Sequence, residues 1–285
     1  MKRTRIRRVH RDANNALIDP QAITRLHYTE KKKQSAKKSI LVWVNTYNRP
    51  EELSRLLLDI YKSKSKHQIK VLVIDDCSTV DYVELLDSFD GRLNIEYQKM
   101  EKNHGKYEYW KLCTYAMNEI AKSPHFDYCV KLDDDGRLVD RFFDRCINIW
   151  ESIKDAKKIC LNFRLDSREG QKVWTGVLPK KEIHNNIKVY RSQWVDMDFF
   201  VTMKFFMALN WRISKPTYAR WHNPYASSGT GRDISTRLAK YGYNLYLTTQ
   251  SLVQHDDHDS HMNLSERARH PLITKPFTDP RYGIL

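Results

Sequence analysis

Strand-length apolar runs alternate with amphipathic segments along residues 39–155 of this chain. In the amphipathic segments the apolar residues recur every three or four positions, which is the spacing of one helix face. Alternation of this kind is typical of a parallel sheet covered by helices, so the predicted fold class is α/β with a Rossmann-like, nucleotide-binding half. Strands are predicted at 39–47, 68–76, 93–98 and 127–135, and helices at 50–63, 80–89, 105–123 and 139–153.

The pattern becomes less regular after about residue 155. A segment rich in Pro, Gly and Ser at 213–232 is long enough to predict a functional loop. A mixed-sheet extension is expected around it, followed by an irregular tail at 256–285. Its predicted strands are 158–165, 172–177, 187–200 and 243–255, and its predicted helices are 202–211 and 233–242.

The positive charge is concentrated at the amino terminus. Residues 1–38 hold 12 Lys and Arg against 3 Asp and Glu, a net charge of +9 out of +14 for the chain. Such an arm fits a solubilising or partner-docking role, or contact with an anionic membrane face. Nucleic acid is disfavoured as a partner because Tyr28 is the arm's only aromatic residue to stack on bases.

No segment of the sequence approaches the roughly 20 apolar residues that span a bilayer, and the amino terminus lacks a secretory signal. We therefore expect a cytoplasmic protein, with the basic arm making peripheral contact at the inner face of the membrane.

Carboxylates follow two of the predicted strands. Asp75 and Asp76 end the second strand, and Asp133, Asp134 and Asp135 end the fourth. Parallel strands end at one edge of a sheet, so five carboxylates should share a crevice that needs a cation or hydrogen-bond donors. Oxygen ligands suit Mg²⁺ or Mn²⁺, which commonly bridge a diphosphate. The alternative is an Asp-rich turn that only caps the next helix.

Four ordered motifs resemble the family 2 glycosyltransferases of the bacterial surface-polysaccharide type. They are VNTYNRPEELSRLL, VLVIDDCST, NHG and VKLDDDG, and GRDISTRLAKYGYNLYLTTQSLVQH is similar to the late segment of that family. The resemblance implies the GT-A fold. After the basic arm at 1–38, a single catalytic domain would fill 39–285, with a nucleotide-sugar-binding half at 39–155 and an acceptor-binding half and tail at 156–285.

The resemblance also implies a donor site at the strand ends. Thr46 and Asn48 would lie beside the nucleotide, and Tyr47 and Arg49 near the base or diphosphate. Asp75 would hydrogen-bond the base.

The implied metal site is the D-x-D pair. Asp135 would bind the metal together with Asp133, and Asp134 would hold the ribose or sugar. His255 would supply a further metal or diphosphate contact, although its acidic and histidine neighbours leave that assignment open.

In such enzymes a carboxylate removes the proton from the attacking acceptor hydroxyl. Asp233 matches the family's position for this base at the start of a helix, although Arg232 stands where the family has Glu. Asp233 could instead cap the helix, and Asp196 and Asp198 are alternative bases. Two lysines after the NHG motif would contact the diphosphate or lie on a solvated helix face: Lys106 and Lys111.

The implied activity is metal-dependent, inverting transfer of a sugar from a UDP-sugar to a hydroxyl of a glycan or lipid-linked glycan, with Mn²⁺ or Mg²⁺. A retaining GT-A transferase and a non-catalytic nucleotide-sugar- or glycan-binding protein on the same fold remain alternatives. A sugar-nucleotide pyrophosphorylase is disfavoured, because TYNRPEEL stands where those enzymes carry a glycine-rich loop.

Overall fold

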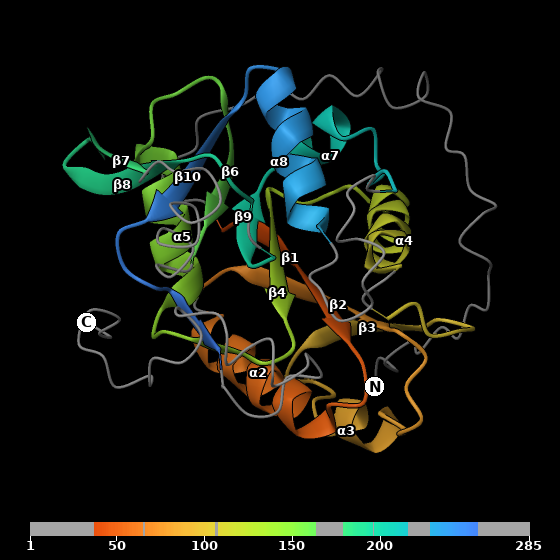
Figure 1. Cartoon of the computed structure of the whole chain (residues 1–285). Coiled ribbons are helices and arrows are strands. Elements are labelled where there is room, and N and C mark those ends of the chain that lie inside the picture. Colours follow the sequence, from red (N-terminus) through yellow and green to blue (C-terminus); the bar gives the residue numbers. More distant parts are fainter. Residues whose placement is uncertain are drawn as a thin grey trace, which may run out of the picture.

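The computed structural model describes residues 37–64, 66–105, 108–163, 179–195, 197–215 and 229–255. Among them, a nine-stranded mixed sheet has the order β3-β2-β1-β4-β9-β6-β10-β8-β7 (Figure 1). The first elements are β1 (Ser39–Thr46), α2 (Pro50–Ser63), β2 (Gln68–Asp75), α3 (Val83–Asp87), β3 (Asn94–Lys99), α4 (Tyr109–Ala121), β4 (Tyr128–Asp133), β5 (Gly136–Leu138) and α5 (Phe142–Ser152). They are followed by β6 (Lys158–Asn162), β7 (Lys180–His184), β8 (Ile187–Ser192), β9 (Phe199–Val201), α7 (Met203–Ala208), α8 (Thr230–Lys240), β10 (Asn244–Thr248) and β11 (Val253–His255).

The first half confirms the α/β prediction. Strand β1 lies between β2 and β4 and pairs with both in parallel. Helices α2, α3 and α5 contribute to the apolar cluster on one face of these strands, while α4, α7 and α8 contribute to the cluster on the other. Both faces are therefore covered, which explains why these strands read as continuous apolar runs.

Helix α2 shows how the local sequence sets these elements. Pro50 occupies its first turn together with Glu51 and Glu52, where a fixed φ and negative charge both favour a helix start. Its buried residues include Leu53, Leu56, Leu57 and Ile60, at the spacing of one helix face. The observed bounds are those predicted.

The second half departs from the predictions in strand assignment. The segment predicted as one strand at 187–200 forms two, β8 and β9, and β9 inserts antiparallel between β4 and β6. Strand β7 was not predicted. It forms a hairpin with β8, and the two residues of the turn, Asn185 and Asn186, both adopt the positive φ that such a turn requires. The predicted strand at 172–177 lies outside the described residues.

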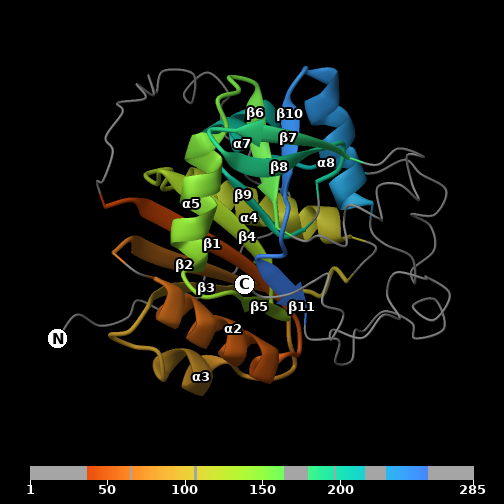
Figure 2. The same ribbon diagram turned by 90° about the vertical axis from the view of Figure 1, so that its left-hand side faces the viewer.

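The predicted strand at 243–255 is also two strands. Strand β10 stays in the main sheet, whereas β11 pairs antiparallel with β5 in a separate two-stranded sheet. Figure 2 shows these two short strands beside each other, away from β7 and β8.

Helix α8 begins three residues earlier than predicted, at Thr230 rather than Asp233. Its cap position is Gly229, so Asp233 lies within the first turn and does not cap the helix. The last three residues of the predicted loop at 213–232 are therefore helical, and the first two of these three are buried. Residues 216–228 of the predicted loop, residues 1–36 of the arm and the tail at 256–285 lie outside the described residues.

Within the described ranges, no helix is long and apolar enough to cross a membrane.

Substitution of Gly231 tests the docking of α8. A Cβ atom there would lie 2.4 Å from the backbone oxygen of Val195, so the backbone would have to shift. We expect Gly231→Ala to lower the free energy of unfolding by about 1–3 kcal/mol in urea denaturation, despite the better helix propensity of Ala. Thr236→Ala, on the exposed side of α8, is the control and should change it by less than about 0.5 kcal/mol. A Gly231→Ala protein as stable as this control would contradict the close packing.

Candidate active site

The carboxyl ends of β1, β2 and β4 meet at one edge of the sheet. Thr46, the last residue of β1, lies opposite Asp75 of β2, and Asn45 lies opposite Asp133 of β4. The strands run toward the side of the molecule where β5, β11 and the first turn of α8 lie (Figure 2). The sheet thus gathers the predicted donor-site residues of these three strands at one edge.

The loops after β1 and β2 are tied to each other. The Asn48 N–H donates to Ser78 Oγ at 2.8 Å, and Asn48 Oδ1 accepts a hydrogen bond from the Thr79 N–H at 2.8 Å. Asn48 adopts a φ of 52°, which asparagine tolerates better than most residues. The Arg49 N–H donates to the Tyr82 hydroxyl at 2.9 Å. These hydrogen bonds hold the backbone of the TYNR segment in place.

Asp75 is fully buried, with hydrogen bonds to both of its oxygens. It accepts hydrogen bonds from the Ser78 N–H at 2.8 Å, the Ser78 hydroxyl at 2.5 Å and the Tyr97 hydroxyl at 2.6 Å. In this arrangement Asp75 organises the loop after β2, and its contact with a base stays a prediction.

Asp76 holds the NHG motif in place. Its Oδ1 accepts from the His104 N–H at 2.9 Å, and its Oδ2 accepts from the Gly105 N–H at 2.8 Å and from Asn103 Nδ2 at 3.3 Å. The His104 ring lies 2.9 Å from the same carboxylate through Nδ1. The sequence singled out both motifs without showing that they contact each other.

Arg49 bridges two of the three consecutive aspartates. Its Nη1 lies 3.3 Å from Asp134 Oδ1 and 2.9 Å from Asp135 Oδ2, with 13% of the side chain exposed. Although burial opposes it, the charge of these carboxylates holds the pKa of Arg49 above its ordinary value. The Thr46 hydroxyl also donates to Asp134 at 2.9 Å. Arg49 thus offsets the like-charge repulsion at the centre of the cluster.

Asp134 has a strongly shifted pKa. Burial and then the negative charge of Asp135 raise the pKa of Asp134 to about 7, against the opposing effect of Arg49. The carboxyl can therefore take up a proton near neutral pH when no metal is present.

Asp133 contacts two fully buried residues. The ammonium of Lys131 donates to Asp133 Oδ1, and the Asp133 N–H donates to Asp198 Oδ1 at 2.8 Å. Burial would lower the pKa of Lys131, but the negative charges of Asp133 and Asp198 hold the pKa above its ordinary value. Sequence reasoning missed Lys131, whose signal was a lysine in the apolar run YCVKLD, two residues before Asp133.

Asp233 is the half-buried carboxylate of α8's first turn. Its Oδ2 accepts from the Ser214 N–H at 3.4 Å and lies 3.8 Å from Nη1 of Arg237. Burial raises the pKa of Asp233, with Arg237 acting in the opposite direction. A base role is chemically suitable, because a raised pKa improves proton acceptance near neutral pH.

The other predicted site residues lie in different parts of the chain's fold or outside the described residues. His255 ends β11, and its backbone lies opposite Gly136, the residue after Asp135. Lys111 pairs with Glu108 at the start of α4. Tyr47 follows β1 and is partly buried. Lys106 and Asp196 lie outside the described residues.

The aspartates suit a metal ion that takes only one or two of its ligands from the protein. Among the described side chains, no group of three or more His, Cys, Asp or Glu is arranged to hold a metal ion. Mg²⁺ is usually bound by one or two carboxylates, with substrate phosphates and water as its other ligands. Asp133 and Asp135 carry oxygen donors of the kind that such a site would use.

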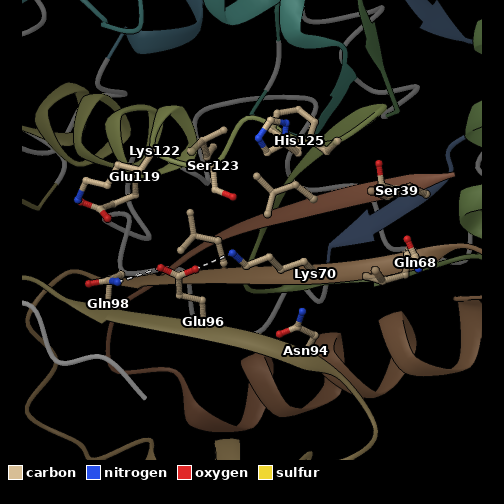
Figure 3. A pocket seen from close by; sticks show the side chains of 16 residues that line it. Ser39, Gln68, Lys70, Asn94, Glu96, Gln98, Glu119, Lys122, Ser123 and His125 are labelled. Atoms are coloured by element: carbon tan, nitrogen blue, oxygen red, sulfur yellow. Dashed lines mark hydrogen bonds and ion pairs between the residues drawn. The ribbon is translucent and has the colours of Figure 1, made fainter. Parts of the chain in front are cut away.

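A cavity of about 720 Å³ lies at the other end of the strands (Figure 3). Ser39, Gln68 and Asn94, the first residues of β1, β2 and β3, line it together with the end of α4. Glu96, one of the two acids that line it, pairs with Lys70 at 2.7 Å. No predicted site residue is among its lining residues, so the cavity does not belong to the carboxylate site.

Comparison with known proteins places the chain in a family. A model of the family described as Glycosyl transferase family 2 matches residues 41–208, more than half of the chain. No curated protein matches the chain.

Solved structures of sugar transferases share the fold. S. aureus TarS 1-349 has 16% identity and a TM-score of 0.51, covering 77% of this chain and 60% of that one. The mannosyltransferase PcManGT from Pyrobaculum calidifontis, in complex with GDP-Man and Mn²⁺, has 15% identity and a TM-score of 0.54, covering 82% and 61%. GalNAc-T7 with UDP, GalNAc and Mn²⁺ has 15% identity and a TM-score of 0.50, covering 75% and 43%. This chain thus spans less than two thirds of each, and the likeness shows the GT-A fold alone.

The shifted pKa of Asp134 predicts a pH-dependent stability in EDTA. The folded protein holds this proton to about pH 7, whereas an unfolded Asp loses it near pH 4, so stability falls as pH rises between these values. We expect Asp134→Asn to stabilise the protein at pH 8 relative to wild type. The gain in the free energy of unfolding should be on the order of 2–4 kcal/mol larger at pH 8 than at pH 5.

Thermal unfolding at both pH values measures this difference. Asp140→Asn, the same substitution at an exposed acid, is the control and should act equally at both. An Asp134→Asn effect on stability that does not change with pH would contradict the raised pKa of the buried Asp134 carboxyl.

Proposed function

This chain belongs to glycosyl transferase family 2, and on that premise we propose that it moves a sugar from a UDP-sugar to a hydroxyl of a glycan or lipid-linked glycan. The observation that carries the proposal is the meeting of the TYNR, IDD and DDD segments at one edge of the sheet. In the fold neighbours, UDP-GlcNAc is bound by TarS and GDP-Man by the mannosyltransferase.

The donor site is assigned to the ends of β1 and β4. Thr46, Asn48 and Arg49 lie along the nucleotide, and the guanidinium of Arg49 is close enough to Asp134 and Asp135 to contact a diphosphate bound there. Asp135 and Asp133 would hold Mn²⁺ or Mg²⁺, and His255 would be a further ligand. When bound, the metal supplies positive charge to the departing diphosphate.

The base is assigned to Asp233. A base must reach the acceptor hydroxyl, and Asp233 keeps 17% of its side chain exposed, whereas Asp198 is fully buried behind β4. Asp233 takes the proton of the attacking hydroxyl, and direct displacement inverts the anomeric configuration. Retention would instead favour a different mechanism on the same fold and would remove the need for Asp233 as a base.

The charge of the amino-terminal arm supports one biological setting. The basic arm suits a cytoplasmic enzyme of bacterial surface-polysaccharide assembly that works at the inner face of an anionic membrane. Residues 39–155 then serve the donor and residues 156–255 and the tail serve the acceptor.

Two matched substitutions separate donor binding from chemistry. Asp135→Asn should weaken UDP binding in the presence of Mn²⁺ at least about tenfold in isothermal titration, because a metal ligand is lost. Asp233→Asn should keep UDP affinity within about twofold but lower sugar transfer by roughly 10²–10⁴, the usual contribution of a general base. Donors are screened by hydrolysis, and NMR of the product gives the anomeric configuration.

Asp140→Asn, on the exposed surface, serves as the control for both substitutions. Normal turnover in Asp135→Asn would refute the metal assignment, and normal transfer in Asp233→Asn would refute the base. Wild-type protein that binds UDP yet turns over no donor or acceptor would favour the non-catalytic alternative.

Removal of residues 1–36 tests the membrane role, since it leaves every described residue in place. This segment carries 10 of the 49 Lys and Arg residues, and each contributes about 1 kcal/mol near an anionic surface. Vesicle co-sedimentation should show binding to phosphatidylserine-containing vesicles in the full chain and at least tenfold less in the truncated one. Equal binding by the two proteins would remove the support for a membrane-contacting arm.

A further inference from the structure

Lys131 is a charged residue in the interior of β4. It is 0% exposed, and the strand register places it between Trp43 of β1 and Phe199 of β9. Lysine is almost never fully buried unless it is paired. Side chains two apart on a strand share a face, so Lys131 and Asp133 point to the same side of the sheet.

The surroundings of Lys131 are built to hold its charge. Its Nζ donates to Asp133 and lies 6.0 Å from the ring centroid of Tyr109. The Tyr109 hydroxyl accepts from Asn45 Nδ2 at 3.0 Å, and Asn45 accepts from Trp43 Nε1 at 2.7 Å. The ammonium thus has a defined position beneath the edge of the sheet.

Asp133 is hydrogen-bonded through both its carboxylate and its backbone N–H. Lys131 binds its carboxylate, and Asp198, itself fully buried, accepts its backbone N–H at 2.8 Å. The pair is also asymmetric, because 29% of the Asp133 side chain is exposed and none of Lys131 is. A ligand can therefore contact Asp133 but not Lys131.

Stability alone does not explain this pair. Replacing a buried ion pair by apolar residues of similar volume is often neutral or stabilising, since desolvating two charges costs as much as their attraction returns. A methionine would fill the space between Trp43 and Phe199 without burying a charge. The position of the pair, directly behind the diphosphate-binding edge, gives it a different use.

We propose that Lys131 is a positioning residue for the nucleotide-sugar donor, which fixes the orientation of the Asp133 carboxylate and offsets its negative charge beside the diphosphate. The inference rests on the proposed function and deepens it. Without the ammonium, Asp133 can rotate and presents an unbalanced charge to an anionic ligand. Both effects weaken the binding of a nucleoside diphosphate.

A double-mutant cycle on UDP affinity tests this role, measured by isothermal titration with excess Mn²⁺. Lys131→Met should weaken UDP binding about tenfold in the wild-type background. In the Asp133→Asn background the same change should alter affinity less than about threefold, because Lys131 acts only through Asp133. If Lys131→Met fails to fold, Lys131→Gln, which keeps a donor for Asp133, takes its place in both backgrounds.

Lys158→Met is the matched control. Lys158 is a half-buried strand lysine whose Nζ donates to the backbone oxygens of Trp150 and Ile153, and its loss should lower stability without changing UDP affinity more than about twofold. An unchanged UDP affinity in Lys131→Met, or an equal effect in both backgrounds, would overturn the inference while leaving the donor site intact. Wild-type protein that binds no UDP would instead refute the proposed function, and this inference with it.

Discussion

Repulsion among carboxylates at one edge of the sheet is the constraint on which the candidate site depends. Parallel pairing of β1, β2 and β4 brings Asp75, Asp76 and the three aspartates at 133–135 to the same edge. Each is compensated by the chain itself: Asp75 by Ser78 and Tyr97, Asp76 by the NHG loop, Asp134 and Asp135 by Arg49, and Asp133 by Lys131. The loops at this edge of the sheet are therefore shaped by the need to hold these charges together.

Topology connects this edge to the second half of the chain. Strand β9 inserts antiparallel beside β4, which places Asp198 under the backbone of Asp133. Strand β11 leaves the main sheet and pairs with β5, so that the backbone of His255 comes opposite Gly136. Close packing of Gly231 against Val195 seats the first turn of α8, which carries Asp233. Asp198 and the backbone of His255, both distant in sequence, thus lie beside the aspartates.

The sequence was sufficient for the first half, except for the short strand β5, because its other strands are buried on both faces and its helices have one apolar stripe, as in α2. It was insufficient where the neighbouring strand determines the bounds and the pairing of a segment. The apolar content of 187–200 and 243–255 does not reveal that each segment breaks and changes neighbours. The motifs predicted the residues at the strand ends, but not the engagement of Asp75 by Ser78 and Tyr97. Lys131 depends on tertiary packing against Tyr109 and Asp198, which no local pattern records.

We propose that a nucleoside diphosphate binds at the carboxyl edge of the sheet and not in the cavity at the opposite end. Amide hydrogen exchange of the wild-type protein, with and without UDP and Mn²⁺, distinguishes these two ends directly. Protection is predicted in the loops at 46–49, 76–79 and 133–138, with no change at 68–70 and 94–96. Protection confined to 68–70 and 94–96, or no protection in either region, would contradict the account.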